Sequence, residues 1–74
     1  MSTITYTFTV TGMHCGSCGL LIDEAIEETA GVHRSHTSVR AGRTVVDLDP
    51  AVIDPSILTA VIGSLGYTAH LEPA

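Results

Sequence analysis

The sequence predicts an α+β fold whose elements follow the order β-α-β-β-α-β. Three observations support this. A strictly alternating apolar segment opens the chain, two segments with helical spacing lie in its two halves, and turn residues set them apart from three more strand-like segments. Two helices on one face of a four-stranded antiparallel sheet satisfy this order. Because 74 residues leave room for one core, we expect a single domain over residues 1–74.

The first predicted strand covers residues 3–11, where the sequence T-I-T-Y-T-F-T-V-T alternates without interruption. Threonines occupy one face, and the apolar face carries Ile4, Tyr6, Phe8 and Val10. This alternation is typical of a strand with one buried side. Gly12 ends the strand, and a short loop follows with Met13, His14, Cys15 and Gly16.

The first helix is predicted from about Ser17 to Ala30, with Gly31 as its C-terminal cap. Its expected core-facing positions share helical spacing: Leu21, Ile22, Ala25, Ile26 and Thr29. The helix also carries four carboxylates with like-charge spacing: Asp23, Glu24, Glu27 and Glu28. These acids form either a solvated face or an anionic docking surface for a basic partner.

Two strands, Val32 to Arg40 and Arg43 to Asp49, are predicted on either side of the turn Ala41-Gly42. The second strand has Thr44, Val46 and Leu48 on one face. The first carries Ser35 and Thr37 where apolar residues are expected, so we expect it to be loosely packed.

Asp54 and Pro55 predict the start of a second helix, from about Pro55 to Leu65, as N-cap and first helical residue. Its expected buried positions are Leu58, Val61, Ile62 and Leu65. A last strand, Tyr67 to Glu72, follows Gly66 and turns Tyr67, Ala69 and Leu71 inward. The complete order is that of the ferredoxin-like arrangement.

Composition excludes several classes of function. Hydrophobic residues make up 45% of the chain and charged residues 15%, which is typical of a folded domain. The net charge is −5, so binding to nucleic acids or anionic membranes is not expected. No apolar run approaches the ~20 residues that cross a bilayer. The first ten residues lack the features of a secretory signal, so we expect a cytoplasmic protein.

Cys15 and Cys18 are the candidate functional residues, because a CxxC pair at the start of a helix can direct both sulfur atoms at one point. The N-terminus of a helix stabilises thiolate over thiol. Two soft thiolates suffice for Cu(I), whereas a structural zinc site usually takes four protein ligands. A dithiol oxidoreductase is the alternative from a different class, although the Trp or Pro that usually flanks a redox pair is absent.

The segment G-M-H-C-G-S-C over residues 12–18 resembles the GMxCxxC motif of the heavy-metal-associated (HMA) domain family, and most of all its bacterial copper chaperones of the CopZ type. Gly31-Val32, the segment V-V-D-L-D-P over residues 45–50, and Gly66-Tyr67 extend the resemblance over the chain. It implies a non-enzymatic cytosolic carrier that binds one Cu(I) through Cys15 and Cys18. The carrier would pass its ion by ligand exchange to a copper-transporting P-type ATPase.

The resemblance also implies roles around the cysteines and leaves alternatives open. Met13 is expected to pack the loop onto the core, and Tyr67 to lie near the sulfur atoms. His14 stands where the family usually has Thr or Ser, so it is a candidate auxiliary ligand. The alternatives are a metal-binding domain of such an ATPase and a carrier for zinc, cadmium or mercury. Since two-coordinate copper accepts a third ligand, a copper-bridged homodimer is a further hypothesis.

Overall fold

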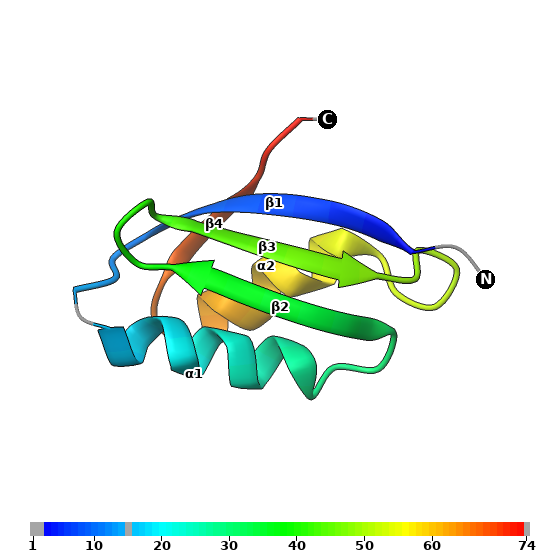
Figure 1. Ribbon diagram of the computed structural model, residues 1–74, viewed down its shortest axis with the longest axis horizontal. Coiled ribbons are helices and arrows are strands. Elements are labelled where there is room, and N and C mark those ends of the chain that lie inside the picture. The colour runs from blue at the N-terminus through cyan, green and yellow to red at the C-terminus, as the bar shows by residue number, and fades with distance from the viewer. Residues whose placement is uncertain (1–2, 15, 74) are drawn as a thin grey trace.

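The computed structural model describes residues 3–14 and 16–73 and confirms the predicted order of elements (Figure 1). The elements are β1 (Ile4–Thr11), α1 (Gly16–Glu27), β2 (Val32–Ser38), β3 (Arg43–Leu48), α2 (Pro55–Ser64) and β4 (Thr68–Leu71). Among the described residues, no helix is long and apolar enough to span a bilayer.

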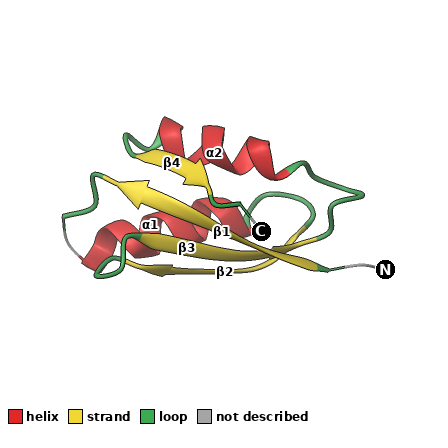
Figure 2. Ribbon diagram, turned by 90° about the horizontal axis from the view of Figure 1, so that it is seen from above, coloured by secondary structure: helices red, strands yellow, loops and turns green. Residues whose placement is uncertain are grey.

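The four strands form one antiparallel sheet in the order β2-β3-β1-β4. The central strand β1 pairs with β3 along most of its length, and with β4 only from Phe8 to Thr11. Helix α1 packs along the edge strand β2, and α2 packs along the opposite edge strand β4 (Figure 2). The two helices also contact each other, which confirms the ferredoxin-like arrangement.

The core lies between the helices and the inner face of the sheet. It consists of Phe8, Val10, Ile22, Ile26, Val46, Leu48, Ile53, Leu58, Ile62 and Ala69. Burying a large aliphatic or aromatic side chain contributes roughly 1.5–3 kcal/mol, so this cluster is the main source of stability. Tyr6, Met13, Val32, Val61 and Tyr67 are half-buried and pack against it.

Four residues predicted to be buried are substantially exposed: Ile4, Leu21, Leu65 and Leu71, at 42%, 52%, 39% and 40%. Ile4 lies beyond the part of β1 that β4 covers, and Leu71 is the last residue of β4. In α1, the residues turned to the core are Ile22 and Ile26, one helical turn apart, and Leu21 is rotated away from them. Leu65 lies just beyond the last residue of α2.

Helix α1 ends at Glu27, three residues before the predicted boundary. The next amide groups continue in a tighter turn, in which the Thr29 amide donates to the carbonyl of Ile26 at 2.9 Å. Gly31 then takes a positive φ of 94°. A Cβ atom at Gly31 would lie 2.8 Å from Ile53 Cγ2, so glycine permits both the turn and the close packing of the following loop.

Candidate metal-binding site

The loop between β1 and α1 begins at Gly12, where φ is +98°. Glycine adopts this left-handed conformation without the strain that a side chain would add. The structure therefore supports the turn that the motif predicts after the first strand. Cys15, the first cysteine of the pair, lies outside the described residues.

Cys18 is the third residue of α1 and is 9% exposed. It lies in the first turn, where amide groups have no acceptor within the helix and the helix dipole places positive charge. Both effects favour a thiolate at this position. The side chain of Cys18 is thus largely covered by the domain, while Cys15 precedes the helix in the sequence.

The residues beside the cysteines differ in exposure. Met13 is half-buried and packs against the core, as expected for a residue that anchors the loop. His14 is exposed, so its imidazole is open to solvent and to an approaching ion. Of these two residues, Met13 therefore packs against the core, and His14 has the accessible side chain.

Tyr67 brings a second loop to the same end of the domain. It follows α2 and Gly66, is half-buried, and packs against the core. A Cβ atom built on Gly12 would lie 3.5 Å from Tyr67 Cδ1. The aromatic ring therefore lies against the residue that opens the cysteine loop. The expectation that Tyr67 lies near the sulfur atoms stays a prediction, because Cys15 lies outside the described residues.

Helix α1 contributes a carboxylate that the sequence analysis did not assign to the fold. Asp23 Oδ1 accepts hydrogen bonds from Ser35 Oγ and Thr37 Oγ1, both at 2.7 Å, and its Oδ2 accepts from the Thr37 amide at 3.1 Å. Glu27 Oε2 accepts from the Ser35 amide at 3.1 Å. The two side chains thus satisfy amide groups that the edge strand β2 does not share with β3.

The expectation of a loosely packed β2 is therefore wrong. Ser35 is 8% exposed and Thr44 on the neighbouring strand is fully buried. Thr37 Oγ1 lies 2.9 Å from Thr44 Oγ1, which links β2 to β3 through their side chains. Polar contacts thus replace the expected apolar ones. Two hydroxyl residues in β2 and two carboxylates four residues apart in α1 are the sequence pattern that could have predicted them.

The four helix carboxylates consequently divide into two pairs. Asp23 and Glu27 bind β2, whereas Glu24 and Glu28, within the described part of the chain, accept no side-chain hydrogen bond from the sheet. Glu24, Glu27 and Glu28 are all exposed. A docking surface at this helix would therefore offer Glu24 and Glu28 as its uncommitted acids, because Asp23 and Glu27 are engaged by β2.

Other candidate ligands do not gather elsewhere in the described part of the chain. His36 lies on β2 and His70 on β4, which are opposite edges of the sheet. Within residues 3–14 and 16–73, no group of three or more His, Cys, Asp or Glu side chains is close enough to hold a metal ion.

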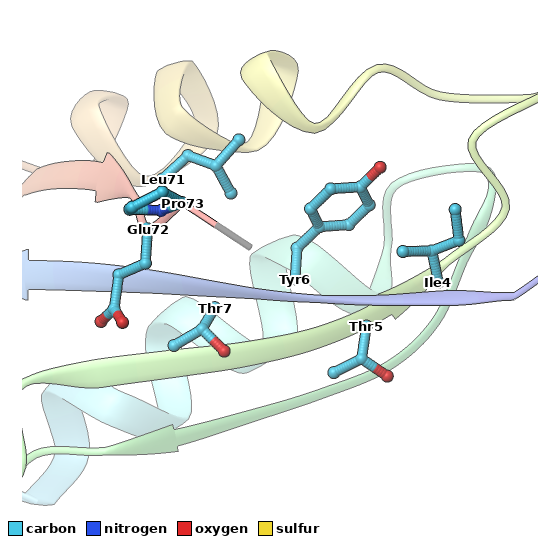
Figure 3. A pocket seen from close by; sticks show the side chains of 7 residues that line it. All are labelled: Ile4, Thr5, Tyr6, Thr7, Leu71, Glu72 and Pro73. Atoms are coloured by element: carbon cyan, nitrogen blue, oxygen red, sulfur yellow. The ribbon is translucent and has the colours of Figure 1, made fainter.

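A surface groove of about 400 Å³ lies at the other end of β1, near Ile4, Tyr6, Leu71 and Pro73 (Figure 3). Tyr6 and Leu71 extend to one side of β1, and Thr5 and Thr7 to the other. The cysteine loop follows the last residue of β1, whereas this groove lies beside its first residues. The groove is therefore separate from the candidate metal site.

Comparison with known proteins identifies the family. The family model of the heavy-metal-associated domain matches residues 7–68, which include the cysteine loop and Tyr67. The chain belongs to this family. The HMA domain is a heavy-metal-binding domain, so the predicted family is confirmed.

Relatives of this HMA domain differ in the metals that their names give. A segment of mercuric reductase from Serratia marcescens is 40% identical over 65 residues, which are 88% of this chain and 14% of the reductase. Copper-transporting ATPase 2 from Homo sapiens is 30% identical over 63 residues, which are 85% of this chain and 4% of the ATPase. The chain thus corresponds to a small part of each of these proteins.

The structure of the copper chaperone of Enterococcus hirae in its apo form superimposes with a TM-score of 0.86 and 30% identity. The match covers 90% of this chain and 98% of the chaperone. The HMA domain described here is therefore similar in fold and extent to a copper chaperone.

Proposed function

We propose that this HMA domain is a Cu(I) carrier that binds one ion between the thiolates of Cys15 and Cys18. The observation that best supports the proposal is the place of Cys18 in the first turn of α1. The amide groups and dipole of the helix favour a thiolate there. A pair of thiolates is a soft donor set, and soft ligands select Cu(I).

Transfer follows from the small number of ligands. A thiolate of the partner binds the ion as a third ligand, and one of the two carrier thiolates then leaves. Each further exchange forms one metal–sulfur bond and breaks another, with no change in the oxidation state of copper. An incoming thiol gives up its proton when it binds. No general base or substrate pocket is needed, so we propose a carrier without catalytic activity.

The partner that we propose is the metal-binding domain of a copper-transporting P-type ATPase. Support comes from the similarity of this chain both to a copper chaperone and to a segment of a copper-transporting ATPase. Two domains of one fold would present similar dithiol loops to each other, and the exchange would then proceed between like ligands. We place the carrier in the cytoplasm, where cysteine pairs are kept reduced.

Hg(II) is the second candidate ion, favoured by the 40% identity to a segment of mercuric reductase. Hg(II) is also a soft ion that two thiolates bind. The two proposals share the ligands Cys15 and Cys18 and differ in cargo and partner. A competition experiment distinguishes the two proposals. Chelators of known affinity buffer the free Cu(I) and Hg(II) concentrations, and the measurement is which ion the two thiolates bind more tightly.

Anaerobic titration with Cu(I) tests the proposal. We expect one equivalent to bind per chain, far more tightly than Zn(II), and Cys15→Ser or Cys18→Ser to lose most of the affinity. Met13→Leu is the matched control, because it removes the thioether sulfur and keeps an apolar side chain against the core. Tight binding by Cys15→Ser, or equal loss in Met13→Leu, would show that the ligands are wrongly assigned.

The copper-bridged homodimer is part of the same proposal. A two-coordinate ion accepts a third sulfur ligand, so two loaded copies can share copper through their four thiolates. Sedimentation at increasing copper-to-protein ratios should then show a shift toward dimer. A chain that stays monomeric above one copper per molecule would contradict this part of the proposal.

A further inference from the structure

The contacts of Asp23 form a directed chain of hydrogen bonds from the sheet to α1. An ionised carboxylate only accepts, and a hydroxyl group has one proton to donate. Thr37 Oγ1 gives its proton to Asp23 at 2.7 Å, so it must accept from Thr44 Oγ1 at 2.9 Å. Thr44 is fully buried. The chain Thr44–Thr37–Asp23 therefore begins inside the sheet and ends on the helix.

Thr37 also contacts α1 one helical turn closer to the cysteines. A Cβ atom on Gly19 would lie 3.3 Å from Thr37 Cγ2 and 3.1 Å from Val39 Cγ2. Gly19 and Asp23 are four residues apart, so they lie on the same face of the helix. A single threonine thus holds α1 at two successive turns, by its methyl group at Gly19 and by its hydroxyl and amide groups at Asp23.

The first of these turns carries Cys18, which directly precedes Gly19 in α1. The position of the Cys18 sulfur therefore depends on how α1 is seated against β2. A seat of three hydrogen bonds to a carboxylate is directional, because each bond requires its donor and acceptor to stay aligned. Apolar packing by itself is non-directional.

We propose that Asp23 is a positioning residue of the metal site, which keeps Cys18 in place through Thr37 while the ion is held and exchanged. This inference rests on the proposed function, since Cys18 is the ligand whose position matters. Asp23 itself does not bind the ion. Its role is to make the helix end a rigid support, so that copper leaves when a partner thiolate replaces a ligand and not when the helix shifts.

A substitution of Asp23 could also change copper binding through the loss of its negative charge. The chain offers a matched control for this charge effect. Glu24 is the next residue of α1, carries the same charge, and is exposed. Removing a negative charge near two thiolates favours their anionic form. Loss of charge alone should therefore strengthen the binding of Cu(I) by the two thiolates. Loosening the helix should weaken binding. The two explanations therefore predict opposite signs.

The experiment compares Asp23→Asn and Glu24→Gln in Cu(I)-loaded protein. Asparagine has the shape of aspartate but directs an NH₂ group at one of its donors, so the alignment with Thr37 is lost. We expect Asp23→Asn to speed the loss of Cu(I) to excess chelator by about threefold or more. This is less than the ~10–100-fold effect of a group bonded directly to a ligand. Glu24→Gln should leave the rate unchanged or slow it.

Amide hydrogen exchange of the metal-free protein supplies a second readout. The amide groups of Ser35 and Thr37, and those of α1 after its first turn, should exchange faster in Asp23→Asn than in Glu24→Gln. Ser35→Ala is a milder variant, which replaces Asp23→Asn if that variant fails to fold. It removes one of the three hydrogen bonds that Asp23 accepts. It should give a smaller change in the same direction in both measurements.

Two results would overturn the inference while leaving the proposed function intact. One is an equal change in the copper dissociation rate for Asp23→Asn and Glu24→Gln. The other is faster amide exchange in Asp23→Asn or Ser35→Ala with an unchanged dissociation rate, because anchoring would then be structural only. Failure of the wild-type chain to bind Cu(I) would instead overturn the proposed function itself.

Discussion

Replacing Gly19 by alanine measures how closely α1 approaches the sheet. The added Cβ atom would meet Val39 Cγ2 at 3.1 Å and Thr37 Cγ2 at 3.3 Å. Both neighbours are β-branched and therefore stiff at χ1. Thr37 is also held by its hydrogen bonds to Asp23. The methyl group can be accommodated only if α1 and the end of β2 move apart by a few tenths of an ångström.

Two opposing terms set the size of the effect. Alanine stabilises a helix interior by about 1 kcal/mol relative to glycine. Overpacking of a close contact costs roughly 1–3 kcal/mol. We therefore expect Gly19→Ala to lower the free energy of unfolding by up to about 2 kcal/mol.

Gly63 in α2 is the matched control, because a Cβ atom there has no neighbour within 4 Å. Gly63→Ala should raise the free energy of unfolding by roughly 0.5–1 kcal/mol, near the helix end. The two glycine-to-alanine variants should thus shift stability in opposite directions. The opposite signs follow from the contact of Gly19 with Thr37 and Val39, which Gly63 lacks.

Urea unfolding followed by circular dichroism provides the measurement. With a slope of about 1 kcal/mol per M for a chain of this size, the two midpoints should differ by roughly 0.5–3 M. A Gly19→Ala midpoint at or above that of the wild type would refute the reasoning. It would mean that α1 is not held closely against Thr37, and the positioning role of Asp23 would lose its structural basis.

Two further predictions concern the loop and the second helix. His14→Thr should lower the affinity for Zn(II) more than the affinity for Cu(I), because Zn(II) prefers more than two ligands and Cu(I) is satisfied by two sulfur atoms. The measurement is the ratio of the two affinities at neutral pH. An unchanged ratio would assign His14 to the solvated surface. The Ser56 amide donates to Asp54 at 2.9 Å and lowers the pKa of Asp54 below its ordinary value of 3.8. The stability that ionised Asp54 contributes is therefore complete above pH 3.8 and is lost as the pH falls through the lowered pKa. The difference in Tm between wild type and Asp54→Ala should shrink on acidification, and a constant difference would contradict this.

Local patterns in the sequence determined the elements of this HMA domain and singled out the cysteine pair that we propose as its metal ligands. The alternation over residues 3–11 predicted a half-buried strand, and β1 covers Ile4–Thr11. Asp54 and Pro55 predicted a helix start that the structure confirms, with Asp54 as N-cap. The CxxC spacing of Cys15 and Cys18 is equally local, because it can be recognised within four consecutive residues. These features need only the period of a strand or helix and the chemistry of a cap.

Contacts between distant segments were decided by the tertiary structure alone. Asp23 is one of four similar acids in the sequence, and only the seating of α1 on β2 selects it to bind Thr37, fourteen residues later. The apposition of Tyr67 and Gly12 likewise joins two loops from opposite halves of the chain. The exposure of Ile4 depends on where the pairing of β4 with β1 stops. A periodic pattern specifies which face of an element is apolar, whereas the register and docking of the elements decide which side chains meet, and these depend on the packing of the whole core.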